Sequence, residues 1–296
     1  MRVLVAGGSG FLGTALRAHL ALAGHNVTQL VRSEPSTPTQ VRWDPDRGVI
    51  TASVVDEADA VVNLAGAPLA HWPWTAAYRK QITESRVATT NTRAEAIAAT
   101  GGSTALVNAS GINYYGSDRG DENLDESSAP GDDFIAEVSK RWESATAAAA
   151  NAGARVGVLR TSVVLDSSGG ALKSLLLPFR LGVGGRLGTG RQWFATVSLD
   201  DYLRAVTRIA TDDTMSGPYN IVAPMAATNA QFTAALGQRL HRPTLLTVPS
   251  FGLKAALPGL SNSLLGGVKA APRRLTEAGF EFSHPTISAQ LDAALA

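Results

Sequence analysis

The sequence of 296 residues is 45% hydrophobic, which is enough to bury a large core. Its 26 basic and 25 acidic residues leave a net charge of +1 with no block of like charge, so neither nucleic acid nor a membrane is an expected partner. Cysteine is absent and the five histidines are scattered, which excludes disulfides and thiolate catalysis and predicts no metal site. We expect a cytoplasmic protein, monomeric or homodimeric, whose partners are small neutral or modestly anionic molecules.

Short apolar runs alternate with stretches of helical period through the first half of the chain. The runs predict strands at 2–6, 27–31, 40–43, 59–64, 104–109 and 155–160, and the periodic stretches predict helices at 11–23, 74–99 and 133–152. Such alternation is typical of right-handed βαβ units, so we expect an α/β fold with a doubly wound parallel sheet.

The alternation ends near residue 165, where the second half of the chain begins. It is followed by a glycine-rich segment at 182–190, a predicted helix at 199–211, a strand at 218–222 and a helix at 228–240. We therefore expect three parts, namely a sheet domain at 1–165 to which some later segments return, a smaller substrate lobe at 166–244 and a C-terminal domain at 245–296. The amphipathic segment at 250–260 favours core packing.

The segment VLVAGGSGFLG at 3–13 carries the strongest chemical signal. Gly7, Gly10 and Gly13 fit GxxGxxG spacing, and Gly8 replaces Gly7 in an overlapping GxGxxG pattern. Glycine is needed where a turn between strand and helix has unusual backbone angles and passes close to a pyrophosphate. The free amides at the start of the following helix, from Phe11 and Leu12 onward, then bind the phosphates of a dinucleotide.

The ends of the next strands predict the rest of the cofactor site. An NAD site usually has an acidic residue after the second strand, whereas this chain has Arg32, which suits the 2′-phosphate of NADP(H) or else is a surface arginine. Asp44 and Trp43 either flank the adenine or form a surface turn. In NLAGAPL, the segment from Leu64 through Ala65 and Gly66 lets the backbone run along the cofactor or simply packs tightly. We include Arg160 among the cofactor contacts.

Several segments in order, including NLAGAPL, NYYG, LRTSVVL, SLDDYLRAV and PRRLTEAGFEF, resemble the short-chain dehydrogenase/reductase superfamily. The resemblance is to its atypical epimerase-family subgroup, whose members carry a C-terminal domain of unknown function. It implies a Rossmann fold and the cofactor NADP(H), with a small-molecule substrate that the resemblance does not identify. In that superfamily the loop after the fifth strand carries a serine that hydrogen-bonds the reacting oxygen, and Ser110 matches it. Tyr114 or the neighbouring Tyr115 either supplies a proton or packs the loop.

The helix at 133–152 departs from the superfamily pattern, which places Tyr-x-x-x-Lys there for proton transfer. Anchoring the match on Glu143 puts Ile135 in the tyrosine position and Ser139 in the lysine position, and Lys140 falls on the far face. The resemblance further implies that Arg86 replaces an asparagine of the proton relay, although a surface ion pair is the alternative for this residue.

Two hypotheses for function follow. The first is an NADP(H)-dependent oxidoreductase or epimerase-like enzyme in which Ser110, Arg86 and Tyr114 act on the substrate. In the glycine-rich loop, Arg186, Arg191 and Trp193 either bind a planar or anionic ligand or belong to a mobile loop with a packed tryptophan. The second is a binding module without catalysis, which the missing Tyr-x-x-x-Lys favours.

Overall fold

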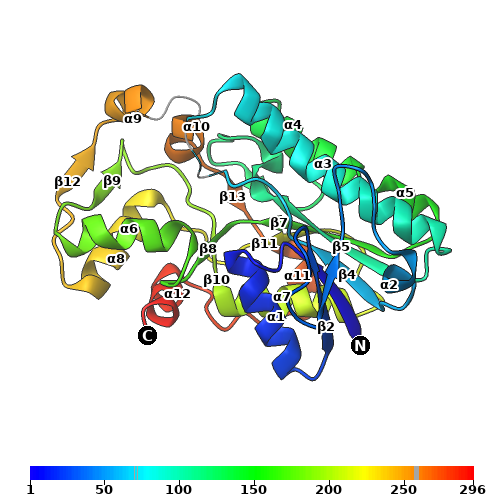
Figure 1. Cartoon of the computed structure of the whole chain (residues 1–296). Helices are drawn as coiled ribbons and strands as arrows, with labels where there is room; N and C mark the ends of the chain where they lie inside the picture. The colour runs from blue at the N-terminus through cyan, green and yellow to red at the C-terminus, as the bar shows by residue number, and fades with distance from the viewer. Residues whose placement is uncertain (70, 72, 257–259) are drawn as a thin grey trace.

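A computed structural model describes residues 1–69, 71, 73–256 and 260–296. Its centre is a seven-stranded parallel sheet in the order β11-β7-β5-β4-β1-β2-β3 (Figure 1). The strands are β1 (Arg2–Ala6), β2 (Asn26–Val31), β3 (Gln40–Arg42), β4 (Ala60–Asn63), β5 (Ala105–Gly111), β7 (Val156–Thr161) and β11 (Gly217–Ile221). The strand order reverses between β1 and β4, which confirms the predicted doubly wound sheet and marks the point where such sheets bind ligands.

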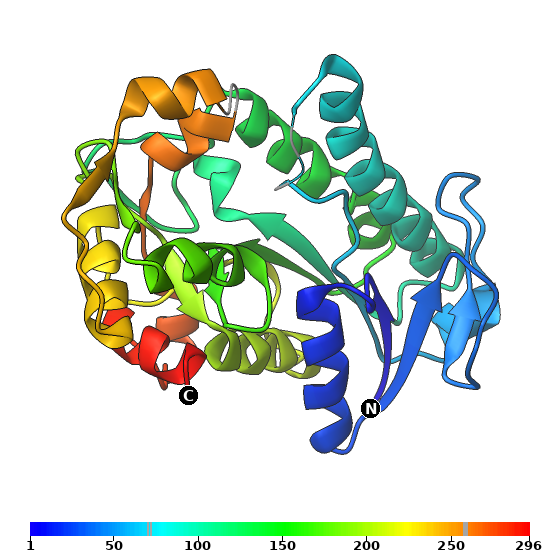
Figure 2. The same ribbon diagram turned by 60° about the vertical axis from the view of Figure 1, so that its left-hand side comes forward.

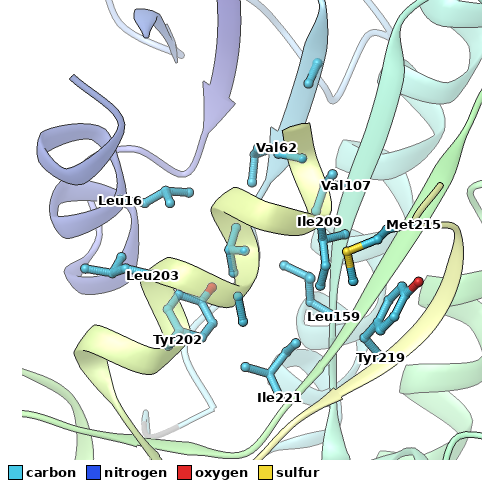
Figure 3. Close-up of a cluster of buried hydrophobic side chains, with 14 of the residues drawn as sticks. Leu16, Val62, Val107, Leu159, Tyr202, Leu203, Ile209, Met215, Tyr219 and Ile221 are labelled. Atoms are coloured by element: carbon cyan, nitrogen blue, oxygen red, sulfur yellow. The ribbon is translucent and has the colours of Figure 1, made fainter. Parts of the chain in front are cut away.

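Helices cover both faces of this sheet because its strands are apolar on both sides. Val3 and Val5 of β1 belong to one buried cluster, and Leu4 and Ala6 belong to another, as the two-residue period of a strand requires. On the first face lie α1 (Phe11–Leu22) and α7 (Leu199–Thr211); on the second lie α2 (Ala52–Asp56), α3 (Ala76–Ala99) and α5 (Ala147–Asn151). Figure 3 shows the first cluster, in which α7 packs between α1 and the strands.

The helix predicted at 133–152 is two helices, α4 (Phe134–Ser144) and α5. They meet at Ala145 and Thr146, where the Thr146 hydroxyl donates to the carbonyl of Glu143 at 2.8 Å. A threonine side chain that bonds the nearby backbone competes with the regular helical ladder. The helix α4 begins at Asp133, whose carboxylate accepts the amide of Ala136, and it buries the face that carries Ile135.

A second lobe stands beside the sheet, as Figures 1 and 2 show. Its core lies between α6 (Gly170–Arg180), α8 (Asn229–Leu240) and α12 (Ile287–Ala294). The sequence did not predict α6, because glycine occupies its cap, Gly169, and its first position, Gly170, and Pro178 lies inside it. Two short parallel pairs complete the lobe: β8 (Val163–Leu165) with β10 (Thr196–Ser198), and β9 (Gly185–Leu187) with β12 (Leu246–Val248). The segments α7 and β11 leave this lobe and return to the central sheet.

The C-terminal part runs back across the molecule to the sheet domain. It contains α9 (Ser250–Ala256), α10 (Leu260–Leu265), β13 (Lys269–Ala270) and α11 (Arg273–Glu277), and β13 pairs with β6 (Asn123–Leu124). Of the amphipathic segment 250–260, residues 257–259 lie outside the described residues, and Phe251 in α9 is 77% exposed rather than packed in a core. Within the described residues, no helix is long and apolar enough to cross a membrane.

Candidate functional site

Three cavities follow one another along the carboxyl ends of the strands. The first has a volume of about 710 Å³ and lies beside β1, β2 and β4; the second, of about 520 Å³, lies between α1, β5 and α4; the third, of about 910 Å³, lies between α4 and the C-terminal helices. The first two share the lining residues Gly7, Gly10, Leu64, Gly66 and Pro68. Ile135 lines both the second and the third. The cavities therefore adjoin one another in a row.

The glycine turn lies where the first two cavities meet. Gly7 has a φ of 75°, and a Cβ on Gly13 would lie 2.1 Å from the Gly7 carbonyl oxygen, so these two glycines shape the turn itself. Gly10 differs, because a Cβ there would meet no atom closer than 3.5 Å. No side chain caps the first turn of α1, which begins after Gly10 with Phe11 and Leu12. Its amides are thus available to an anion in the cavities.

Arg32 lies at the outer end of the first cavity. Its side chain is exposed and forms no hydrogen bond or ion pair with a described residue, and it is the one charged group among the described residues lining this cavity. Ala65 lines the same cavity. Asp44 does not: its carboxylate instead accepts the amides of Asp46 and Arg47, which fixes a turn. The arrangement presents a free cation to a ligand in this cavity.

The buried ring of Trp43 forms part of the wall of the first cavity. Behind it, the guanidinium of Arg93 lies 4.0 Å from the ring centre. Arg93 is fully buried without an acidic partner among the described residues, and this burial lowers its pKa to about 9. Its Nη1 donates to the carbonyl of Thr89, which also lines the cavity, while Nε and Nη2 have no hydrogen-bond partner among the described residues. The tryptophan therefore packs against a buried, positively charged group.

Ser110 and Arg86 line the second cavity, together with Phe11, Leu12 and Gly13 from α1. Arg86 is buried, donates to the Ile82 carbonyl at 3.0 Å and lies 4.9 Å from the ring centre of Trp142. Burial lowers its pKa to about 10, so it remains a cation near neutral pH. Arg86 has no acidic partner among the described residues. This cavity thus contains an uncompensated positive charge.

A buried polar network lies behind Ser110. The Ser110 hydroxyl donates to Glu143 Oε1 at 2.7 Å, and Arg160 donates to both oxygens of the Glu143 carboxylate, each at 2.9 Å. Arg160 lines none of the three cavities. The structure therefore places this residue behind Ser110, outside the lining of the three cavities.

The two tyrosines of the loop after β5 surround Arg160. They belong to the 3-10 helix η1 (Ile112–Tyr115). The Tyr114 ring covers the guanidinium at 3.4 Å and lines none of the three cavities. The Tyr115 hydroxyl accepts from Arg160 at 3.1 Å, and its single proton has two acceptors within reach, Asn220 Oδ1 and the Asp125 carbonyl, each at 2.8 Å. Burial raises the pKa of Tyr115 to about 12. Both rings pack the network, and neither is brought to the substrate cavity.

Residues of α4 complete the second cavity. Ile135 and Ser139 line it, in the positions that the superfamily pattern reserves for tyrosine and lysine, and the Ser139 hydroxyl bonds the Ile135 carbonyl. Lys140 lies outside, as its helical position predicts, with its Nζ 2.7 Å from Glu137. No described residue of α4 therefore offers a phenol or an ammonium group to this cavity.

The third cavity differs from the expected substrate site. Its wall includes the aromatic rings of Trp74 and Phe134, the cations Arg79 and Lys254, and the carboxylates Asp118 and Asp133. Neither cation forms an ion pair with a described residue, and the Arg79 guanidinium lies 4.0 Å from the centre of the Phe134 ring. The glycine-rich loop contributes Leu187, Gly188, Thr189 and Gln192. The predicted Arg186, Arg191 and Trp193 do not line it: Arg186 donates to Thr247, Trp193 donates to Asp121, and Arg191 is exposed.

Sequence reasoning did not assign a role to Glu143, Trp74, Arg79 or Lys254. Only Glu143 carried a signal, because it lies four residues after Ser139, beside the apolar stripe of α4, where an acidic residue needs a buried partner. The third cavity depends on helices that are far apart in the sequence, so no local pattern indicated its residues.

Comparison with known proteins agrees with this geometry. A model of the NAD-dependent epimerase/dehydratase family matches residues 3–222. The chain belongs to this family. A domain of unknown function, DUF1731, matches residues 248–294. An epimerase family protein of Mycobacterium bovis is 39% identical over 290 residues, covering 98% of this chain and 96% of the relative, and the human epimerase family protein SDR39U1 is 38% identical over 303 residues, covering 98% of each.

Solved structures of family members have the same fold. The crystal structure of human SDR39U1 (isoform 2) with NADPH superposes with a TM-score of 0.90 at 35% identity, covering 99% of both chains. A nucleoside-diphosphate sugar epimerase from Corynebacterium glutamicum gives a TM-score of 0.83 at 35% identity, covering 100% of this chain and 58% of the other. The family fold therefore extends over the whole chain, including its C-terminal part.

The glycine turn generates a prediction with an internal control. Gly10→Val should abolish dinucleotide binding in a protein that still folds, because the added side chain enters the cavities without meeting backbone. Gly13→Ala should instead lower the free energy of unfolding by about 1–3 kcal/mol or more, because its Cβ meets the Gly7 carbonyl. Urea unfolding and NADPH titration of both variants test this. Normal NADPH affinity in folded Gly10→Val would contradict the assigned site.

Proposed function

We propose that the chain binds NADP(H) along the first two cavities, with the adenosine half at Arg32 and the nicotinamide half beside Ser110. The observation that carries this proposal is the shared lining of the two cavities at the glycine turn, because a dinucleotide needs two compartments joined at a phosphate site. Support also comes from the crystal structure of human SDR39U1, which contains NADPH.

The residues present fit this cofactor at three points. Gly10 leaves room for a pyrophosphate, and the uncapped amides of α1 suit its charge. Arg32 suits the 2′-phosphate, and the ring of Trp43 provides an apolar wall for the adenine. When bound, the cofactor supplies or accepts a hydride. On one side, the cofactor would then lie against the backbone of Leu64, Ala65 and Gly66.

We infer that the protein is an NADP(H)-dependent oxidoreductase or epimerase-like enzyme. Ser110 and Arg86 line the same cavity and hold the substrate oxygen within hydrogen-bond reach. The third cavity, which shares the lining residue Ile135 with the second, accommodates the rest of the substrate between Trp74 and Phe134. The substrate is a small molecule, and it meets both signs of charge there, because the cations Arg79 and Lys254 and the carboxylates Asp118 and Asp133 all line this cavity.

A second function rests on a specific observation. Ile135 occupies the position of the superfamily tyrosine, so the cavity lacks the usual proton donor. This favours a module that binds NADP(H) without turnover and responds to its redox state. The two functions differ in whether the nicotinamide exchanges a hydride with a substrate bound in the second cavity.

The cofactor proposal predicts a preference for NADPH. Wild-type protein should bind NADPH at least roughly tenfold more tightly than NADH, because a charge-assisted phosphate contact contributes about 1.5–3 kcal/mol. Arg32→Ala should lose this preference with little change in NADH affinity. Arg2→Ala, at an exposed arginine that begins β1 and so lies at the end of the sheet away from the cavities, is the matched control and should behave as wild type. Calorimetric titrations that give equal affinities for both cofactors in wild type would refute the assignment of Arg32.

The enzyme proposal predicts a catalytic contrast between two residues. The first step is a screen of carbonyl compounds and nucleotide sugars, in which the absorbance of NADPH reports turnover. With an active substrate, Ser110→Ala should lower turnover by roughly a hundredfold or more without weakening NADPH binding, since the hydroxyl acts on the substrate oxygen. Lys140→Ala should have little effect, because Lys140 lies outside the cavity. A complete absence of turnover in the screen would favour the binding module.

A further inference from the structure

The network behind Ser110 fixes the direction of its hydrogen bonds. Glu143 accepts two parallel bonds from Arg160, which is the geometry of a carboxylate paired with a guanidinium. An ionised carboxylate only accepts hydrogen bonds. The single proton of the Ser110 hydroxyl must therefore point to Glu143 Oε1, which lies 2.7 Å away.

Arg160 cannot easily turn away from Glu143. Its guanidinium lies under the Tyr114 ring at 3.4 Å and also donates to the Tyr115 hydroxyl at 3.1 Å and to the Glu126 carbonyl at 3.3 Å. The Arg160 side chain is only 4% exposed, so water does not compete for these bonds. Every contact around Arg160 thus supports the same orientation of the Glu143 carboxylate.

We propose that Glu143 makes Ser110 a hydrogen-bond acceptor toward the second cavity, so that the group bound there is the hydroxyl of an alcohol substrate. With its proton bound to Glu143, Ser110 presents only lone pairs to the cavity. Donation to a substrate carbonyl would require breaking a charge-assisted bond, which is roughly twice as strong as a neutral one. Glu143 is in this sense a positioning residue that acts through Ser110.

Arg86 supplies the donor that Ser110 cannot. It lines the same cavity as a buried cation without an acidic partner among the described residues. Arg86 therefore stabilises a carbonyl oxygen or an oxygen that becomes negative. Ser110 accepts a hydrogen bond from a substrate hydroxyl, which keeps its proton. This division of roles deepens the proposed function and rests on it.

The experiment compares two probes of similar shape, cyclohexanol and cyclohexanone. Saturation-transfer NMR measures the affinity of each probe for the NADP⁺-loaded protein. Wild type should bind cyclohexanol about threefold to tenfold more tightly, because only the alcohol donates to Ser110. Replacement of the buried pair by apolar residues of similar length, Glu143→Met with Arg160→Met, frees the Ser110 proton while leaving no unpaired charge. This variant should gain affinity for cyclohexanone. Ser110→Ala should lose the alcohol preference without that gain.

Several outcomes would overturn the inference. These are a wild-type preference for cyclohexanone, equal affinities, no binding of either probe, or an unchanged preference in the double variant. Neutron diffraction from wild-type crystals provides a measurement that needs no variant: the Ser110 deuteron should lie on the line to Glu143, and a deuteron facing the cavity would refute the proposal. NADPH titration is made in parallel, so that loss of cofactor binding, which would refute the proposed function, is distinguished from failure of this inference.

Discussion

The ion pair between Glu143 and Arg160 joins the separate parts of the molecule at the candidate site. Glu143 comes from α4 and Arg160 from β7, and the strand register places Arg160 between Ser110 of β5 and Asn220 of β11. Parallel strands align residues of equal register on the same face, so these three side chains form one row across the sheet. Through Tyr115 the row continues into the loop after β5.

The same row reaches the C-terminal part of the chain. The Glu126 carboxylate accepts the amide of Asn220 at 3.0 Å and that of Arg274, at the start of α11, at 3.3 Å. Asn220 in turn donates to the carbonyl of Ala271 at 2.9 Å. The segment that follows α10 is therefore fixed to the sheet by buried bonds, and α10 is held over the third cavity. The C-terminal part and the sheet domain are coupled through this contact.

The fold was predictable because its signals are local. Strands with apolar residues on both faces, helices of amphipathic period and a glycine turn after the first strand each occupy a short window of sequence. The glycine turn and Arg32 were placed at the cavities by the same local reasoning. The roles of Tyr114 and Arg160 were not predictable, because they depend on strand register and on which side of a loop a ring packs, and neither has a signature in the sequence. Arg160 is a cation at the end of a strand, as Arg32 is, but Arg160 is buried against Glu143 and two tyrosines whereas Arg32 is exposed.

A buried ion pair is a costly way to stabilise a fold. Removing two charges from water costs about as much as their attraction returns, and apolar side chains of similar volume often stabilise a protein equally well. Glu143 and Arg160 are therefore better explained by what they orient than by the free energy of unfolding. They hold the Ser110 hydroxyl in one hydrogen-bonding direction beside a cavity with a free cation, at the switch point of the sheet. A site that only contained a cofactor would not need that direction to be fixed, and this difference favours chemistry at Ser110 over passive binding.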